Sequence, residues 1–201
     1  MTTINFTNKP TREIYGLMTQ TIIPRPIAWI LTNNSNQSFN LAPFSFFNGV
    51  SSTPPLLSVS IGHKSDGTKK DTWLNIESRS HFIVHIPPAH LATSVTKTAE
   101  PLPHGESEIL AAELKTISEP DWPLPRLQDC PVAMYCERHR VIDIPDCQQG
   151  FIIGEIKALY VADNMIELKE NRLIVDAKKI DPLLRLGGFS YGTLGKVFEV
   201  K

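Results

Sequence analysis

Proline is the residue that most restricts how this chain can fold. The sequence has 16 prolines in 201 residues, with five of them between positions 24 and 55 and six between positions 101 and 131. Proline breaks helix interiors and cannot donate to the hydrogen bonds of a central strand, so it belongs at turns, strand edges and bulges. Long helices are therefore excluded over much of the chain, and a mainly β architecture is favoured.

Short runs of β-forming residues between turn residues predict seven or so strands. In residues 81–86, side chains alternate with the period of two that is typical of a half-buried strand. Residues 132–144 and 151–161 predict a long hairpin whose turn lies in 143–150. The other expected strands are residues 26–32, 38–41, 56–61 and 196–200.

Only short helices are expected, at residues 71–77, 89–99 and 107–115, with Asp71 suited to capping the first of them. Strands that do not alternate with long helices argue for an antiparallel barrel or sandwich. The proline-rich segment 100–131 is interpreted as a surface insertion within a single domain that spans residues 1–201.

Composition excludes several classes of function. A net charge of -1 provides no footprint for nucleic acid or an anionic membrane. There is no apolar run long enough to span a bilayer and no signal-peptide pattern, so a cytoplasmic protein is expected. The three cysteines form no Cys-x-x-Cys pair and are expected to be reduced thiols.

Familiar catalytic motifs are missing as well. The sequence contains neither G-x-S-x-G nor H-E-x-x-H, and the residues around Gly187 and Gly195 fail the dinucleotide and phosphate-loop patterns. His81 and His85 share a strand face but have no identifiable third ligand, so they are interpreted as ordinary strand histidines. No metal site and no catalytic residue is predicted.

Residues 40–48, Asn-Leu-Ala-Pro-Phe-Ser-Phe-Phe-Asn, interleave three aromatic rings with small polar groups. Rings can cover the apolar part of a flat ligand while the backbone and short side chains bond to its edge. Just upstream, Arg25 stands between two prolines and is aimed either at an anion or at a structural carboxylate partner.

Residues 67–72, Gly-Thr-Lys-Lys-Asp-Thr, lead into an expected helix N-terminus. The unsatisfied N–H groups and dipole there, with two lysines and two hydroxyls, fit a phosphate monoester. The alternative is an ordinary solvated loop with an N-cap. An aromatic platform together with a phosphate cradle describes FMN in outline.

The order of these motifs resembles the flavin reductase-like family, FMN-binding split-barrel proteins that include flavoredoxin and the reductase components of two-component monooxygenases. The motifs that carry the resemblance are residues 24–29, 40–48, 54–55, 70–76 and 185–191. The resemblance implies a mainly β, antiparallel split β-barrel of Greek-key type with a few short flanking helices. It also implies a homodimer with the flavin at or near the subunit interface.

The resemblance further implies roles for particular residues. The segment from Asn40 to Ser45 would contact the isoalloxazine edge and ribityl chain, Lys70 and Thr72 would hold the phosphate, and Tyr191 would lie near the flavin or the dimer contact. The full set of expected cofactor-binding residues is Arg25, Asn40, Ala42, Pro43, Phe44, Ser45, Lys70, Asp71, Thr72 and Tyr191.

The expected function is that of an FMN-dependent oxidoreductase that reduces flavin with NAD(P)H. Two alternatives stay open: an FMN-containing electron carrier reduced by a protein partner, and a flavin-binding protein without turnover. The flavin would supply the redox chemistry and the protein its position and electrostatics. The sequence does not distinguish NADH from NADPH and does not identify the final electron acceptor.

Overall fold

The computed structural model describes residues 1–103 and 105–200. Its strands are β1 Arg25–Pro26, β2 Ala28–Asn33, β3 Phe39–Phe44, β4 Phe47–Ser52, β5 Pro55–Gly62, β6 His81–Ile86, β7 Thr116–Ile117, β8 Arg126–Leu127, β9 Val132–Asp143, β10 Gln149–Val161, β11 Ile166–Lys169, β12 Arg172–Val175, β13 Leu184–Gly187 and β14 Ser190–Gly192. Its helices are α1 Thr11–Thr21, α2 Asp71–Arg79, α3 Ala92–Lys97, α4 Glu108–Ala111 and α5 Ala177–Ile180, with 3-10 turns η1 Ala89–Leu91 and η2 Asp163–Met165.

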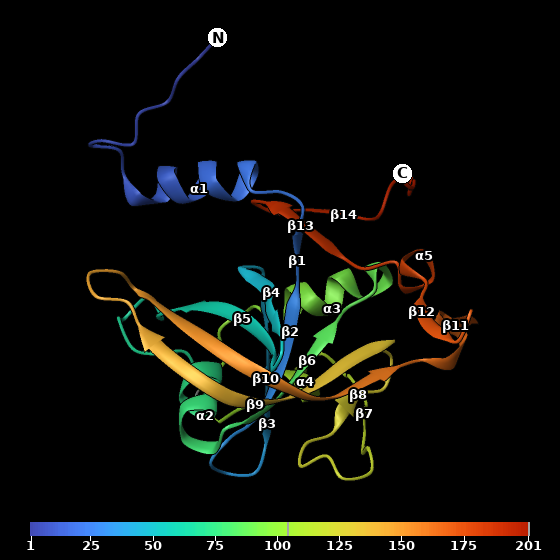
Figure 1. Ribbon diagram of the computed structural model, residues 1–201. Helices are drawn as coiled ribbons and strands as arrows, with labels where there is room; N and C mark the ends of the chain where they lie inside the picture. The colour runs from blue at the N-terminus through green and yellow to red at the C-terminus, as the bar shows by residue number, and fades with distance from the viewer. Residues whose placement is uncertain (104, 201) are drawn as a thin grey trace.

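Seven strands form one antiparallel sheet in the order β3-β2-β6-β9-β10-β5-β4 (Figure 1). The two edge strands, β3 and β4, follow each other in the chain and are separated only by Ser45 and Phe46. The sheet therefore curls on itself, but these edges are not paired with each other in the described chain. This architecture confirms the expected split barrel, and the crossing from β5 to β6 gives it a Greek-key connection.

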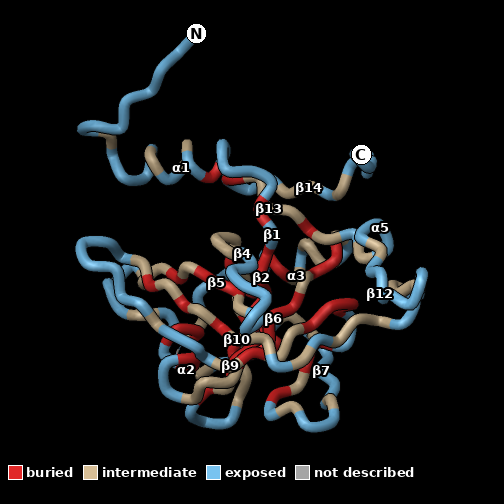
Figure 2. The backbone as a smooth tube through the Cα atoms, in the orientation of Figure 1, coloured by how far each residue is buried: buried red, intermediate tan, exposed pale blue. Residues whose placement is uncertain are grey.

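The sheet separates two hydrophobic cores, and β2 contributes to both of them. Ala28 and Ile30 point into the barrel, where Trp73 and Ile76 of α2 pack against strand residues. Trp29 and its alternate neighbours point outward into a second core. Because both faces are covered, β2 is almost continuously buried (Figure 2). Such double burial explains its near-continuous apolar sequence.

The proline-rich segment 100–131 covers the outer core. It contributes Ile109, Leu124 and Leu127 to that core, together with a short ladder between β7 and β8. The buried ring of His85 ties the segment to the barrel: Nδ1 lies 2.9 Å from the carbonyl of Trp29, and Nε2 accepts from the N–H of Leu127 at 2.9 Å. Both ring nitrogens are therefore used by the backbone, as a structural histidine requires.

A second layer lies above the barrel and consists of α1 and the small sheet β1-β13-β14 (Figure 1). The sequence did not predict α1, because Gly16 and three threonines give it weak helix propensity. Tertiary contacts compensate, since the guanidinium of Arg25 donates to the carbonyls of Thr19 and Ile22 at the end of the helix.

Several expected elements differ in extent. The β9–β10 hairpin and the extent of β6 are confirmed, but residues 196–200 form no strand. The expectation that β6 is half-buried was wrong: Phe82 and Val84 lie in the inner core and Ile83 in the outer one, so both faces are buried. The helix expected at 89–99 consists of η1 followed by α3. The helix expected at 107–115 ends at Ala111, and Glu113 has φ +55°, a value incompatible with a continuing helix. Short-range periodicity identifies such elements better than it defines their ends.

No helix in the described part of the chain is both long and apolar enough to cross a membrane. The cysteines are free thiols: Cys130 and Cys136 are buried in the cores, and Cys147 is exposed on the β9–β10 turn.

Candidate functional site

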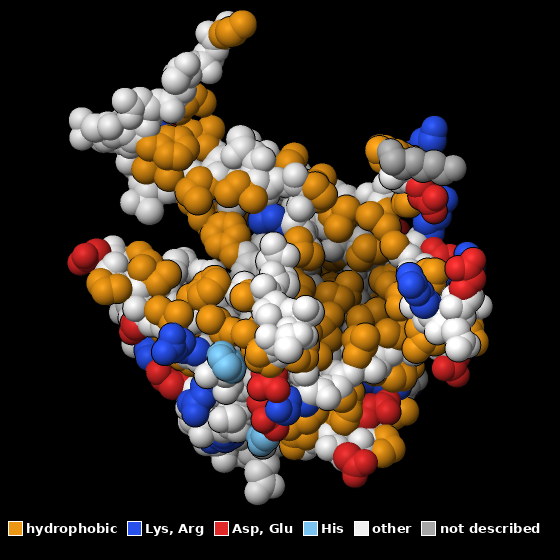
Figure 3. All heavy atoms as spheres, in the orientation of Figure 1, with side chains coloured by type: hydrophobic (Ala, Val, Ile, Leu, Met, Phe, Trp, Pro, Cys, Tyr) orange, Lys and Arg blue, Asp and Glu red, His pale blue; other side chains and the backbone are white. Residues whose placement is uncertain are grey.

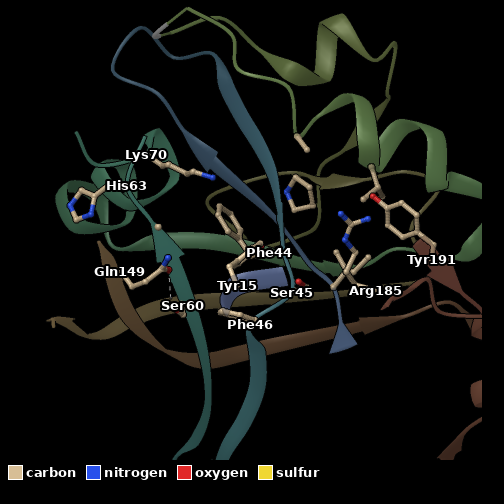
Figure 4. Close-up of a pocket in the computed structure, with 15 residues that line it drawn as sticks. Tyr15, Phe44, Ser45, Phe46, Ser60, His63, Lys70, Gln149, Arg185 and Tyr191 are labelled. Atoms are coloured by element: carbon tan, nitrogen blue, oxygen red, sulfur yellow. Dashed lines mark hydrogen bonds between the residues drawn. The ribbon is translucent and has the colours of Figure 1, made fainter. Parts of the chain in front are cut away.

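A cavity of about 350 Å³ lies where the barrel meets the layer of α1, β13 and β14. The short connection between β3 and β4, Ser45 and Phe46, forms part of its wall. Its lining comes from widely separated segments (Figure 4): Tyr15, Ile27, Pro43, Phe44, Ser45, Phe46, Ser60, Gly62, His63, Lys70, Val95, Ala99, Gln149, Arg185 and Tyr191.

The cavity has an aromatic middle and two polar ends. Phe44, Phe46 and Tyr15 lie in the middle of the view, His63 and Lys70 at one end, and Arg185 with Tyr191 at the other (Figure 4). Side-chain hydrogen bonding also orders the floor, where the Ser60 hydroxyl donates to Oε1 of Gln149 at 3.1 Å. This arrangement suits a flat ring with polar edges.

A second cavity of about 460 Å³ continues from the first and shares Pro43, Phe44, His63, Lys70 and Ala99 with it. Its walls come from β3, from the start of α2 with the loop before it, and from the beginning of the 100–131 segment: Asn40, Ala42, Pro43, Phe44, His63, Lys64, Ser65, Asp66, Lys70, Asp71, Thr72, Thr98, Ala99, Glu100, Pro101, Leu102 and Glu108. Nine of the ten predicted site residues line at least one of the two cavities; the exception is Arg25.

Asn40 and Thr72 form a buried support for the second cavity. Nδ2 of Asn40 donates to Oγ1 of Thr72 at 2.9 Å and to Oγ1 of Thr32 at 3.2 Å. These bonds hold β3 against the first turn of α2. The Thr72 side chain is thus linked to the strand that lines the cavity, which orients both residues.

Arg25 acts behind the cavity. Besides its bonds to the carbonyls of α1, Nε donates to Oγ of Ser45 at 3.3 Å. Burial, and to a smaller extent the neighbouring Arg185, lowers the pKa of Arg25. The sequence left open whether Arg25 meets an anion or a carboxylate. In the structure its partners are two backbone carbonyls and the Ser45 hydroxyl, so Arg25 positions Ser45 from behind the cavity.

The start of α2 differs from the expected cap. Lys70 occupies the N-cap position, and Asp71 is the first helical residue. The carboxylate of Asp71 accepts from Nζ of Lys64 at 3.0 Å, which corrects its predicted capping role. Lys70 lies with its ammonium 5.7 Å from the centre of the Phe44 ring, and burial lowers its pKa. A cation held at the junction of the two cavities is well placed to meet an anion.

Sequence reasoning missed several lining residues. Nδ1 of His63 is buried without a hydrogen-bond partner among the described residues, although His63 lines both cavities. Glu108 accepts from the N–H of Leu41 at 2.8 Å, and burial raises the pKa of Glu108. Arg185 stacks on Tyr191 with the guanidinium 4.5 Å from the ring centre. The signal available for Arg185 was its place in the C-terminal motif.

These residues fit a flavin. Phe44 and Phe46 offer apolar surface, and Ser45, Gln149 and the orphaned nitrogen of His63 offer bonding groups for a polar ring edge. In the adjoining cavity Lys70 provides a positive charge for a phosphate, whereas the charge of Lys64 is paired with Asp71.

The family model described as "Flavin reductase like domain" matches residues 18–183, and the chain belongs to this family. The structure is similar to that of nitrilotriacetate monooxygenase component B from Bacillus cereus, with a TM-score of 0.91, 33% identity, and 100% and 98% of the two chains covered. It is also similar to 2-nitrobenzoate 2-nitroreductase NbaA from Pseudomonas fluorescens, with a TM-score of 0.89, 29% identity, and 100% and 95% covered. Among curated sequences, the uncharacterized YwrF of Bacillus subtilis is 32% identical, with 94% and 93% covered. The family and these likenesses support a flavin-related redox function.

Proposed function

We propose that this protein binds FMN and uses it for NAD(P)H-dependent reduction of flavin. The observation that carries the proposal is the pair of joined cavities: an aromatic one of the size of a ring system, and one that places Lys70 and Lys64 beside the first turn of α2. In this arrangement the ring lies between Phe44 and Tyr191, and the phosphate lies at Lys70. Backbone groups of β3 and the Ser45 hydroxyl meet the ring edge.

When bound, the flavin supplies the hydride and electron chemistry. The chain's own residues bind it, orient it and limit its contact with water. None of the lining side chains is needed as an acid or a base, and none is proposed as catalytic. The name of the Bacillus cereus protein, a component of a monooxygenase, supports a role in delivering reduced flavin to a separate oxygenase.

The cofactor is tested on the purified protein. A yellow protein with absorption bands at about 370 and 450 nm is expected, as for oxidised flavin. Mass spectrometry of the released ligand should identify FMN. FAD as the sole species would contradict the proposal, because the two cavities then leave an adenylate unaccounted for.

The reductase activity is tested by anaerobic stopped-flow mixing of the FMN-loaded protein with NADH or NADPH. Rapid bleaching of the flavin absorption band after mixing with NADH or NADPH supports the reductase. Bleaching only by a reduced protein partner would instead establish an electron carrier, and no bleaching by either would indicate a binding protein.

A further inference from the structure

Three residues lie directly opposite one another across the small sheet over the cavity. Arg25 on β1 pairs with Arg185 on β13, and Arg185 pairs with Tyr191 on β14. Arg25 is buried, and its guanidinium donates hydrogen bonds to carbonyls at the end of α1 and to the Ser45 hydroxyl. Arg185 lies at the cavity end, stacked on the Tyr191 ring. The row therefore presents one guanidinium to the cavity and another behind it.

Two like charges opposite each other on a sheet destabilise it unless another group compensates. Arg185 donates to the carbonyl of Gly188, but within residues 1–103 and 105–200 it forms no ion pair. Where the partly buried Arg185 lines the cavity, no carboxylate of the described residues pairs with it. A bound anion would supply that compensation.

The anion at Arg185 is not the FMN phosphate in the proposed arrangement. Lys70 and Arg185 lie at opposite ends of the first cavity, with the aromatic residues between them (Figure 4). If the phosphate lies at Lys70, the ring occupies the middle, and Arg185 faces the next molecule to enter.

Beyond Arg185, the surface of the protein is formed by α3. Tyr191 lines both the first cavity and a shallow depression that also includes Thr96 and Lys97. The Tyr191 hydroxyl lies 3.1 Å from Oγ1 of Thr96, which fixes the ring between the two hollows. A long ligand can therefore pass over Tyr191, with one end over the aromatic middle and the other along α3.

We propose that Arg185, held on Tyr191, binds the diphosphate of the nicotinamide dinucleotide, whose nicotinamide lies against the flavin ring at the open side of the first cavity and whose adenosine half lies along α3. This inference rests on the proposed function. Guanidinium groups bind phosphate oxygens through paired donors, and Arg185 is the cation at this end of the cavity with such a fork. Arg185 is thus a residue that binds the reductant and is distinct from those proposed to bind FMN phosphate.

Calorimetric titration of the FMN-loaded protein with ADP-ribose, which carries the diphosphate but no nicotinamide, tests this directly. Loss of a charge-assisted bond weakens binding by about ten- to a hundredfold. Arg185→Gln should show that loss, and Arg185→Lys, which keeps the charge but not the fork, should fall between it and wild type. Arg172→Gln, on the exposed β12 strand, is the matched control and should bind as wild type does.

The proposal is overturned if the wild type does not bind ADP-ribose or if Arg185→Gln and Arg185→Lys both bind it as tightly as wild type. Melting temperatures show whether each variant folds. If Arg185→Gln does not fold, the ADP-ribose affinity of Arg185→Lys decides: an affinity equal to that of wild type overturns the proposal.

Reduction kinetics separate this proposal from the reductase proposal. The kcat/KM of flavin reduction is compared for two hydride donors: the dinucleotide that reduces the wild type, NADH or NADPH, and N-benzyl-dihydronicotinamide, a neutral donor without phosphate. Arg185→Gln should lower kcat/KM at least tenfold more with the dinucleotide than with the neutral donor. Equal losses with both donors would overturn the diphosphate contact. If neither dinucleotide reduces the wild type although ADP-ribose binding depends on Arg185, the reductase proposal fails and the anion subsite stands.

Discussion

Lys70 is a single side chain at the junction of the two cavities, and its effect on affinity can be predicted. Lys70→Ala removes one cation facing the proposed phosphate, and charge-assisted hydrogen bonds contribute about 1.5–3 kcal/mol. FMN affinity should therefore fall about ten- to a hundredfold, whereas riboflavin affinity, measured by the same fluorescence titration, should hardly change.

The neighbouring Lys69 offers a matched control. Its ammonium pairs with Glu77 at 2.9 Å and lies 4.7 Å from the Trp73 ring centre, and it lines neither cavity. Lys69→Ala should leave FMN affinity close to that of wild type. Equal weakening of FMN and riboflavin by Lys70→Ala would place Lys70 outside the phosphate site.

His85 makes the stability of the protein sensitive to acid. Burial lowers the pKa of His85 from 6.5 to about 4. Between these values the unfolded chain binds more protons than the folded one, so stability falls as the pH falls. Between pH 7 and pH 5 this group should remove roughly 2 kcal/mol from the free energy of unfolding.

Urea denaturation at both pH values measures that loss. His85→Gln removes the titrating group and should show a smaller loss between pH 7 and pH 5, even if it is less stable at both. His139→Gln, at an exposed position of β9, should keep the wild-type loss. An unchanged pH dependence in His85→Gln would show that other groups cause it.

At the scale of elements, β10 depends on glycine for its fit inside the barrel. A Cβ at Gly150 would lie 2.0 Å from the Trp73 ring of α2, and one at Gly154 would lie 2.4 Å from Phe82. Both positions face the inner core, where large rings from α2 and β6 fill the space. The strand therefore uses missing side chains to admit those rings.

Gly150→Ala should destabilise the protein by about 1–3 kcal/mol through overpacking. Urea denaturation followed by circular dichroism measures this change. Gly49→Ala on β4 is the control, because a Cβ there meets nothing within 4 Å, and its effect should be small. Equal stability of the two variants would mean that Trp73 moves without cost.

At the scale of the whole molecule, we propose that the protein forms the homodimer that the family resemblance implies, and exposed apolar side chains on the upper layer support this. Figure 3 shows hydrophobic side chains gathered along α1. Tyr15 on α1 and Ile22 just after it are more than half exposed, and Phe189 before β14 is 97% exposed. Phe44, by contrast, is buried in the barrel and offers no such surface. A two-fold dimer would bury such surface on both copies at once.

Because Tyr15 and Tyr191 of the same layer line the first cavity, FMN is expected to stabilise the dimer by mass action. Sedimentation at low concentration should show the FMN-loaded protein dissociating less than the apo form. A loaded protein that sediments as a monomer would contradict the shared site.

Phe189→Ala tests which surface forms the dimer. Burial of one such ring contributes about 1.5–3 kcal/mol, so the dimer dissociation constant should rise at least about tenfold. Leu110→Ala, on α4 and 79% exposed, is the control and should leave the constant unchanged. If the two variants dissociate alike, the interface lies elsewhere.

The sequence by itself determined the strands whose pattern is local. The β-forming residues of β6, the turn residues of the β9–β10 hairpin and the prolines around β2 and β3 predict an antiparallel barrel or sandwich, because strand and turn patterns are visible within a few residues. The choice of a split barrel came from the family resemblance. The motifs of residues 40–48 and 67–72 likewise predicted a ring and a phosphate site, since the polar and aromatic groups are contiguous there.

Only the tertiary structure decided what meets those motifs. Gln149, Arg185 and Tyr191 come to the cavity from strands more than 100 residues after β3, and their arrival depends on sheet register, which no local pattern encodes. Arg25 binds backbone carbonyls. Because every residue has a backbone carbonyl, the residue types in a sequence do not indicate which one an arginine will bind. Those carbonyls lie at the end of α1, and tertiary contacts of this kind stabilise a short helix more than its own propensity does.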